Sequence, residues 1–334
     1  MPEKTSTTAQ YRLFQEADLE GVLSLWQDHS GWGAITETQF RNWYLNTPHG
    51  ACLVAVMEEE NGQILGQMVM IPTQATFQGK SLKVLRAVAP ILHSAARSLR
   101  LTDRDHPALQ LYRCLMLEAK EQDYALAYTF PAYGWQALMK VFPKHGLPAW
   151  HISEFECYAL DLEKPFDDHL QEAASQILVQ KVNSIQGDYD QLWQEALGQW
   201  PFQYSICRNK NWLQWRQGGH LVLEMRQKNN LHLMGYLVID QRTHLLIDAL
   251  AASLEALKLV LQAGIWALHT QNEERIPFDG KELKVMYTDF MAKALEGMAL
   301  QKVDFTFTFG CNPFQDWLDP DKLDTQDWYL MPND

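Results

Sequence analysis

The feature that most constrains the fold is an internal repeat that divides the chain into two similar halves. The segment NWYLNTPHGACLVAVMEEENGQILGQMVM at 42–70 aligns without a gap with NWLQWRQGGHLVLEMRQKNNLHLMGYLVI at 211–239, so that Gly66 meets Gly235. Each segment follows a related stretch, LWQDHSGW at 25–32 and LWQEALGQW at 192–200. A pattern that recurs in the same order indicates one structural plan used twice.

Each half predicts a helix, a β-hairpin and then alternating strands and helices. Apolar residues have helical spacing at 19–27 and 189–197, and Asn-Gly or Asn-Asn turns close the hairpins. Gly66 and Gly235 indicate a bulge or a close backbone approach in the second hairpin strand. The later elements predicted are strands at 81–92, 124–130 and 154–162 with helices at 107–121 and 133–142 in the first half, and helices at 249–268 and 290–297 with strands at 283–289 and 304–310 in the second.

This alternation predicts an α/β fold, with mixed α+β sheets, built from two similar domains in tandem. A chain of 334 residues is long enough for two domains, each with its own core. We place the N-terminal domain at 1–163, a linker at 164–187 and the C-terminal domain at 188–334.

Composition narrows the classes of partner. The net charge of −13, with dispersed acidic residues, argues against nucleic acid, because binding it needs a basic face. The five cysteines are scattered and form no CxxC pair, which is typical of reduced thiols in a cytoplasmic protein. The first residues lack the apolar core of a signal peptide, and no stretch is apolar for the length of a membrane span. We therefore expect a cytoplasmic protein without a membrane span.

The predicted order of elements resembles the GNAT acyltransferases. In the first half, AVAP at 87–90 is similar to the Val-His-Pro that ends the fourth strand of that family, and KHGL at 144–147 resembles its Lys-x-Gly-Phe. The second half resembles the degenerate partner domain of tandem GNAT proteins, including DPDKLDTQDWYL at 319–330. The resemblance implies an acyl thioester as co-substrate, usually acetyl-CoA, held where strands four and five splay apart, and an amine as acceptor.

The phosphate-binding motif of the family is altered in this chain. The family has Arg/Gln-x-x-Gly-x-Gly/Ala before the helix that follows strand four, and the best register here is RDHPAL at 104–109. Pro107 removes a backbone amide, and Leu109 adds bulk where a phosphate would approach. The resemblance implies three phosphate-side candidates: Arg104, His106 and Ala108. The alternative is an ordinary helix start with Thr102 or Asp105 as N-cap and Pro107 in the first turn.

The stretch ILHSAARSLRLTDRD at 91–105 is longer than the usual loop of the family and is rich in small and basic residues. Together with the end of strand four it provides small residues that leave room for a long acyl chain, Ala87, Ala89, Ala95 and Ala96, and arginines that meet phosphates, Arg97 and Arg100. Val88 is a further candidate for binding the donor. The alternative is a solvated loop whose arginines balance nearby acids.

The general acid of the family is often a tyrosine, and the matching position here is Phe142, which cannot donate a proton. Tyr133 and Tyr128 are the candidate substitutes, and His93 is the candidate base because histidine titrates near neutrality. The alternative for each is a structural role, as a packing aromatic or a lone histidine.

The second half is expected to hold no acyl-donor site, since its helix after LLIDAL begins without glycine or basic residues. Asp248 is expected to cap that helix or to face solvent. Four tryptophans are candidates for one wall of an acceptor cleft or for the core: Trp212, Trp215, Trp317 and Trp328. No HExxH, Gly-x-Ser-x-Gly or Walker-type motif occurs, so we expect no metal.

Two functions remain open at this point. The first is an N-acyltransferase that uses acyl-CoA, or a thioester on acyl-carrier protein, with an acyl group that can be longer than acetyl. Its acceptor would be an amine on a peptide side chain, an amino sugar or a lipid precursor. The second is a non-catalytic GNAT-like module that has lost acetyl-CoA and binds a ligand or a protein.

Overall fold

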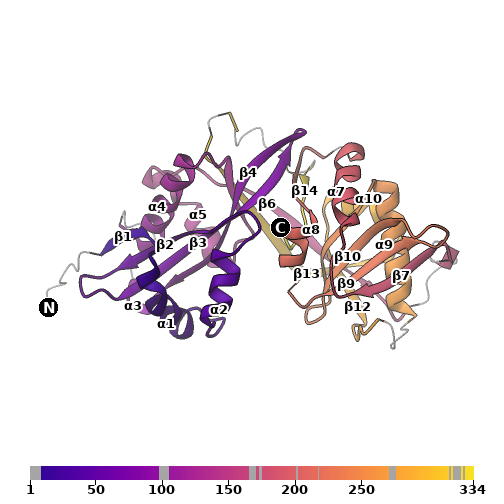
Figure 1. Ribbon diagram of the computed structural model, residues 1–334, viewed down its shortest axis with the longest axis horizontal. Helices are drawn as coiled ribbons and strands as arrows, with labels where there is room; N and C mark the ends of the chain where they lie inside the picture. The colour runs from indigo at the N-terminus through magenta and orange to yellow at the C-terminus, as the bar shows by residue number, and fades with distance from the viewer. Residues whose placement is uncertain are drawn as a thin grey trace. The chain divides into compact units, whose positions relative to one another are not determined.

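The computed structural model describes residues 9–97, 105–164, 171–172, 175–200, 202–216, 218–270, 276–315, 317–318, 325 and 328–334. The candidates Arg100 and Arg104 lie outside these ranges, and only the backbone of Tyr133 is described. The chain forms two compact units (Figure 1). Unit 1 comprises Met1–Gln74, Leu82–Ile152 and Phe309–Leu323, and unit 2 comprises Ala75–Ser81, Ser153–Thr308 and Asp324–Asp334.

Unit 1 contains a mixed sheet in the order β1-β2-β3-β4-β5, with the end of β13 beside β5. Strands β2 and β3 are antiparallel, whereas β4 and β5 are parallel. Its elements are β1 (Gln10–Leu13), η1 (Glu16–Asp18), α1 (Leu19–His29), α2 (Glu37–Phe40), η2 (Arg41–Leu45), β2 (Leu53–Glu58), β3 (Ile64–Phe77), β4 (Lys80–Leu92), α3 (Ser94–Arg97), α4 (Pro107–Glu121), β5 (Leu126–Thr129), α5 (Tyr133–Met139) and η3 (Phe142–His145).

The core of unit 1 lies between its sheet and the helices on either side. Figure 1 shows α4 and α5 on one side of β2 and β3, and α1 and α2 on the other. Leu111 and Leu115 of α4 pack with Met68 and Met70 of β3 in one cluster of buried residues. The amphipathic spacing of α4 explains why its predicted bounds, 107–121, are confirmed by the structure.

Unit 2 repeats this plan. The run α7, β9, β10, β11, α9, β12, α10 has the same order as α1, β2, β3, β4, α4, β5, α5, which confirms the α/β class and the repeat. Its elements are β6 (His151–Asp161), β7 (Ile177–Val182), α7 (Asp188–Gln199), β8 (Tyr204–Ile206), α8 (Lys210–Arg216), β9 (Leu221–Gln227), β10 (Leu233–Asp240), β11 (Leu245–Ala251), α9 (Leu254–His269), β12 (Glu282–Met286), α10 (Asp289–Ala294), β13 (Leu300–Pro313) and β14 (Trp328–Tyr329). The sheet has the order β13-β6-β12-β11-β10-β9-β7.

The last strand of each half pairs within the unit formed by the other half. In unit 2, β6 of the first half pairs with β12, with Cys157 opposite Met286. In unit 1, the end of β13 pairs with β5, with Gly310 opposite Thr129. The stretch 164–187, which we expected to be a linker, contains β7, and β7 pairs antiparallel with β9 in unit 2.

Two expectations for the second half are wrong. The helix predicted at 249–268 begins only at Leu254, because Ser253 caps it by accepting a hydrogen bond from the amide of Ala256, and Ala249–Ala251 belong to β11. Asp248 neither caps this helix nor faces solvent: it lies within β11 with 1% of its surface exposed. The apolar residues around Asp248 fit a strand and a helix equally well, so periodicity alone did not separate the two.

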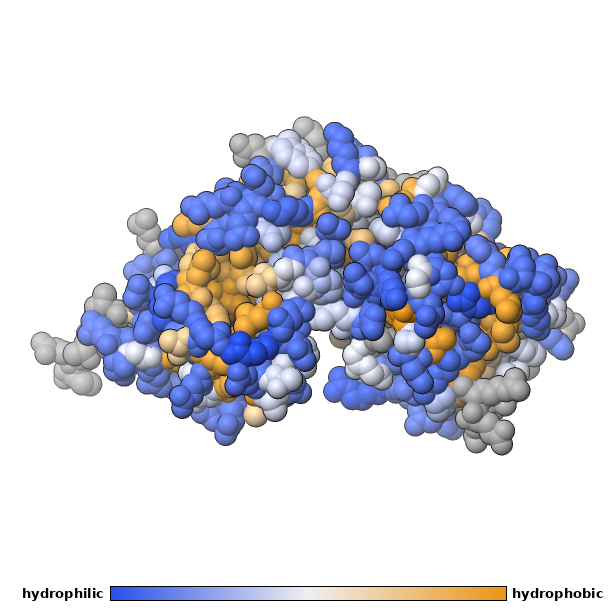
Figure 2. Space-filling model, viewed as in Figure 1, coloured by the Kyte–Doolittle hydropathy of each residue, from blue (hydrophilic) through white to orange (hydrophobic). Residues whose placement is uncertain are grey.

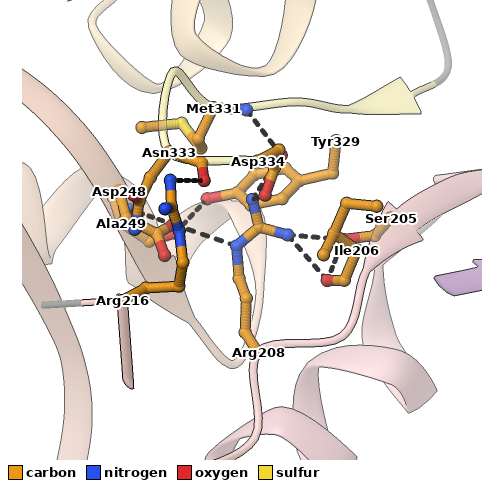
Figure 3. A network of polar contacts seen from close by, with 10 residues as sticks. All are labelled: Ser205, Ile206, Arg208, Arg216, Asp248, Ala249, Tyr329, Met331, Asn333 and Asp334. Carbon is orange, nitrogen blue, oxygen red and sulfur yellow. Dashed lines mark hydrogen bonds and ion pairs between the residues drawn. The ribbon is translucent and has the colours of Figure 1, made fainter. Parts of the chain in front are cut away.

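Asp248 belongs to a buried ionic network in unit 2 (Figure 3). The guanidinium of Arg208 donates from Nε to Asp248 at 2.9 Å and from Nη2 to both carboxylate oxygens of Asp334 at 2.7 Å. Its Nη1 donates to Ser205 Oγ at 2.8 Å, and its cationic centre lies 4.8 Å from the ring centroid of Tyr329. A buried cation needs such partners, because taking it out of water costs several kcal/mol. The network holds the segment around Asp334 against β11.

No helix among the described residues is long and apolar enough to cross a membrane.

Candidate functional site

A cavity of about 680 Å³ opens in unit 1 where β4 and β5 stop pairing. The parallel ladder of these strands runs from Val84–Leu126 to Arg86–Tyr128. Beyond the last pair, residues 87–90 of β4, the last residue of β5, Thr129, and Phe130 after it line the cavity. This is the position that the resemblance implied for the thioester, at the carboxyl ends of two parallel strands.

The walls of the cavity are mainly apolar. Figure 2 shows a hollow with apolar walls on unit 1, within a mostly hydrophilic surface. The structure brings six of the predicted binding residues together around the cavity: Ala87, Val88, Ala89, Arg97, His106 and Ala108. The larger apolar lining residues are Trp32, Met68, Leu92, Leu111, Phe130, Trp135 and Leu138. Such a lining suits the chain of an organic ligand with a few polar groups.

Helix α4 begins at the edge of this cavity. His106 is its N-cap: Nδ1 of the imidazole accepts a hydrogen bond from the amide of Ala108 at 3.3 Å. Asp105 is therefore not the cap, and Thr102 lies outside the described residues. Pro107 occupies the first helical position, where its missing N–H would have no partner within the helix. Leu109 is fully buried in the core, so its bulk is directed away from the cavity.

The backbone of β4 is distorted at Ala89, which has a φ of 48°. A left-handed conformation costs a residue other than glycine about 1 kcal/mol, and such costs concentrate at functional sites. Ala89 lies beyond the last pair of β4 with β5, Arg86–Tyr128, and it lines the cavity.

Arg97 ties two neighbouring segments together at the cavity wall. Its Nε donates to the carbonyl of Leu92 at 2.8 Å, and its Nη2 donates to the carbonyl of His29 at the end of α1. Neither of these two hydrogen bonds uses the third guanidinium nitrogen of Arg97, Nη1. Arg97 as a phosphate ligand stays a prediction.

His93 lies at the end of β4 but is not among the residues that line the cavity. Its Nδ1 accepts a hydrogen bond from the amide of Ala95 at 3.2 Å, and its ring centroid lies 4.2 Å from that of His29. Burial, and to a smaller extent the nearby His93, lowers the pKa of His29. The catalytic role of His93 stays a prediction.

Tyr128 and Phe142 pack in the interior. Tyr128 is 0% exposed and its ring is stacked 6.3 Å from that of Phe309. Phe142 lies in the core, 4.7 Å from the ring of Tyr112. The position at which GNAT acyltransferases often have their general acid is therefore occupied here by a side chain that packs in the core. Tyr133 begins α5, whose Gly134 and Trp135 line the cavity; both tyrosines stay predicted catalytic residues.

Sequence reasoning missed the lining residues that come from distant parts of the chain: Ser30, Trp32, Gln67, Met68 and Gly134. Only the fold brings them to the end of β4. Gln67 carried a usable signal, because it is the polar residue within the apolar run ILGQMVM of β3. No cluster of three or more His, Cys, Asp or Glu that could hold a metal occurs within the described ranges.

The tryptophans of the second half divide between core and surface. Trp212 and Trp328 are each 1% exposed, whereas Trp317 is 59% exposed. Trp212 and Trp328 are therefore core residues and not part of the wall of an open cleft.

No protein-family model and no curated protein matches the sequence. Solved structures do match the fold. A GCN5-related N-acetyltransferase from Anabaena variabilis aligns over 92% of this chain and 73% of its own, with a TM-score of 0.64 and 12% identity. A probable N-acyltransferase from Enterococcus faecalis aligns over 90% and 72%, with a TM-score of 0.62 and 11% identity.

The N-myristoyltransferase of Saccharomyces cerevisiae, solved with bound myristoyl-CoA, aligns over 93% of this chain and 80% of its own, with a TM-score of 0.55 and 14% identity. The chain therefore has the fold of the GNAT acyltransferases along nearly its whole length, as its motifs implied.

Proposed function

We propose that the protein is an N-acyltransferase that moves an acyl group from a CoA thioester, or from a thioester on acyl-carrier protein, to an amine. The observation that carries the proposal is the apolar cavity at the divergence of β4 and β5, with the start of α4 at its edge. Its volume lies in the range of pockets that hold drug-sized ligands, which favours acyl groups longer than acetyl. The structural neighbours include one with bound myristoyl-CoA, a long-chain donor.

The residues of the cavity would act mainly by positioning. The start of α4 carries partial positive charge and attracts phosphate oxygens, helped by Arg97, Arg100 and Arg104. The acyl chain would lie against the apolar wall. The amine nitrogen then attacks the thioester carbonyl carbon, the C–S bond breaks, the sulfur leaves with the bonding electron pair and the nitrogen loses a proton. Holding both reactants in this geometry supplies much of the rate enhancement.

In this proposal His93 accepts the proton of the amine, and Tyr133 or Tyr128 donates one to the leaving sulfur. The acceptor is an amine on a peptide side chain, an amino sugar or a lipid precursor.

A second function, a non-catalytic module that binds the same thioesters, is favoured by Phe142, which packs in the core where the family often has an acid. The two functions share the cavity and differ in turnover.

Thermal unfolding with CoA thioesters of rising chain length tests the binding step. A thioester that binds the folded state raises Tm by several degrees when its concentration is about a hundred times Kd. Ala87→Trp, which fills the cavity, should abolish the shift, whereas Ala252→Ser, outside the cavity in unit 2, should keep it. An absence of any shift, with carrier-protein thioesters as well, would contradict both functions.

A second measurement separates the enzyme from the non-catalytic module. The enzyme should release free CoA thiol from a bound thioester when a primary amine is present, whereas the module should not.

A further inference from the structure

Gln67 of β3 is a buried polar residue in the wall of the apolar cavity. Its exposed surface is 0%, and its neighbours along the strand are apolar. A carboxamide offers two N–H donors and a carbonyl acceptor, all of which require partners when water is excluded.

Among the residues that the structure describes, neither Nε2 nor Oε1 of Gln67 has a hydrogen-bond partner. Most buried polar atoms in folded proteins are paired, because an unpaired one loses its hydration without compensation. The amide of Gln67 therefore points to a ligand with a complementary polar group.

Gln67 lies opposite the last residues of β4, beyond the point where β4 stops pairing with β5. The amide of His93 donates to the carbonyl of Leu65 at 2.8 Å, which fixes the pairing of β3 with β4 at that end. Because β3 and β4 form an antiparallel hairpin, two residues further along β3 bring Gln67 level with Ile91, between the cavity-lining residues Pro90 and Leu92. A polar group that meets Gln67 is thus near the site proposed for the thioester.

Adjacent residues of a strand point to opposite faces of the sheet, so Gln67 and Met68 face opposite ways although both line the cavity. Met68 packs with Leu111 of α4, on the side where α4 begins. A thioester whose phosphates lie at the start of α4 can pass its acyl portion through the divergence of β4 and β5 to the side of Gln67.

We propose that Gln67 binds a hydroxyl group on the acyl chain, at the second or third carbon, so that the preferred co-substrate is a hydroxylated acyl thioester. This inference rests on the proposed function. The hydroxyl donates to Oε1 of Gln67 or accepts from Nε2, and the rest of the chain contacts apolar wall. A plain acyl chain would leave the amide buried and unpaired.

Isothermal titration of the full chain with decanoyl-CoA, 2-hydroxydecanoyl-CoA and 3-hydroxydecanoyl-CoA tests the proposal. One hydroxylated thioester should bind about tenfold more tightly than decanoyl-CoA, which is what one buried hydrogen bond contributes. Gln67→Met, which keeps the length of the side chain without its polar atoms, should bind all three within about twofold of one another. Met68→Leu, the matched variant on the other face, should keep the preference even where it changes every affinity.

Equal binding of the three thioesters by the wild-type protein would overturn the proposal and leave the proposed function intact. A uniform loss of affinity in Gln67→Met would also overturn it, because Gln67 would then contact a part that the three ligands share. A lower Tm of Gln67→Met would indicate a structural partner for the amide instead. If neither CoA thioesters nor the same acyl groups on acyl-carrier protein bind at all, the proposed function fails and the inference fails with it.

Discussion

At the scale of single residues, the ionic network of unit 2 is unusual because one buried cation faces two buried carboxylates. Arg208, Asp248 and Asp334 are each at most 1% exposed, so the network carries an excess negative charge in the interior. Burial, the largest cause, raises the pKa of Asp248 to about 6; Asp334 adds to the rise, and Arg208 opposes it. The folded protein therefore holds a proton on Asp248 at pH values where the unfolded chain has released it.

This difference predicts a pH dependence of stability. The pKa of Asp248 is higher in the folded state than its ordinary value of 3.8, so folding takes up a proton between about pH 4 and pH 6. The contribution of Asp248 to the free energy of unfolding is therefore largest near pH 4 and is lost as pH rises through 6. Asp248→Asn should flatten the change between pH 4.5 and pH 7.5 by about 1–3 kcal/mol, measured by urea unfolding.

Asp304→Asn is the matched control, because Asp304 is an exposed acid of the same unit and the side-chain replacement is the same. Its stability should follow the wild-type pH profile. If Asp248→Asn follows that profile too, Asp248 does not titrate in this range.

At the scale of elements, Gly66 and Gly235 occupy the same position in the two hairpins but have different surroundings. A Cβ at Gly66 would lie 2.8 Å from Cδ2 of Leu92, the end of a flexible side chain. A Cβ at Gly235 would overlap the carbonyl oxygen of Leu250 and lie 2.7 Å from Cγ2 of Val260. Both positions confirm the predicted close approach, but only Gly235 is confined by a neighbouring strand backbone.

Alanine substitutions should separate the two settings. Gly235→Ala should lower the free energy of unfolding by about 3 kcal/mol, because the ladder of β10 with β11 must shift, and Gly66→Ala by about 1 kcal/mol, because Leu92 can adjust. Chemical denaturation measures both. In Gly198→Ala the added Cβ meets no atom within 4 Å, and α7 should gain up to about 1 kcal/mol. Equal losses at Gly66 and Gly235 would contradict the distinction.

The same scale shows what the sequence could predict. The hairpins, α4 and the small residues of AVAP were readable, because turn residues, periodicity and the repeat are local signals. The start of α9 was misplaced, since the apolar run 245–251 does not distinguish a strand from a helix, and the cap at Ser253 was overlooked. The cap at His106 is a local contact, but the sequence also offered Asp105, a residue type that caps helices more often. Gln67 is readable as a polar residue in an apolar run, whereas the cavity that it meets depends on tertiary placement.

At the scale of the whole molecule, each unit is completed by a strand from the other half of the chain. In unit 1 the end of β13 shields β5, and Asn312 is fully buried there. Its side chain donates to the carbonyls of Pro148 and Ala149 at 3.1 and 2.8 Å, and it accepts from the hydroxyl of Tyr112 at 2.6 Å. Removing this strand would leave several buried polar groups without partners and β5 as an open edge.

A fragment of residues 1–163, the domain that the repeat suggests, should therefore fail to unfold cooperatively in urea and should bind a dye for exposed apolar surface. The same fragment joined to residues 309–323 through a flexible Gly/Ser linker should regain a cooperative transition, since the added strand restores the partners of Tyr112 and the ladder with β5. Asn312→Leu in the joined fragment should weaken this rescue, because the carbonyls of Pro148 and Ala149 would again lack donors. A cooperative transition of residues 1–163 alone would show that the end of β13 is dispensable and that the N-terminal half folds by itself.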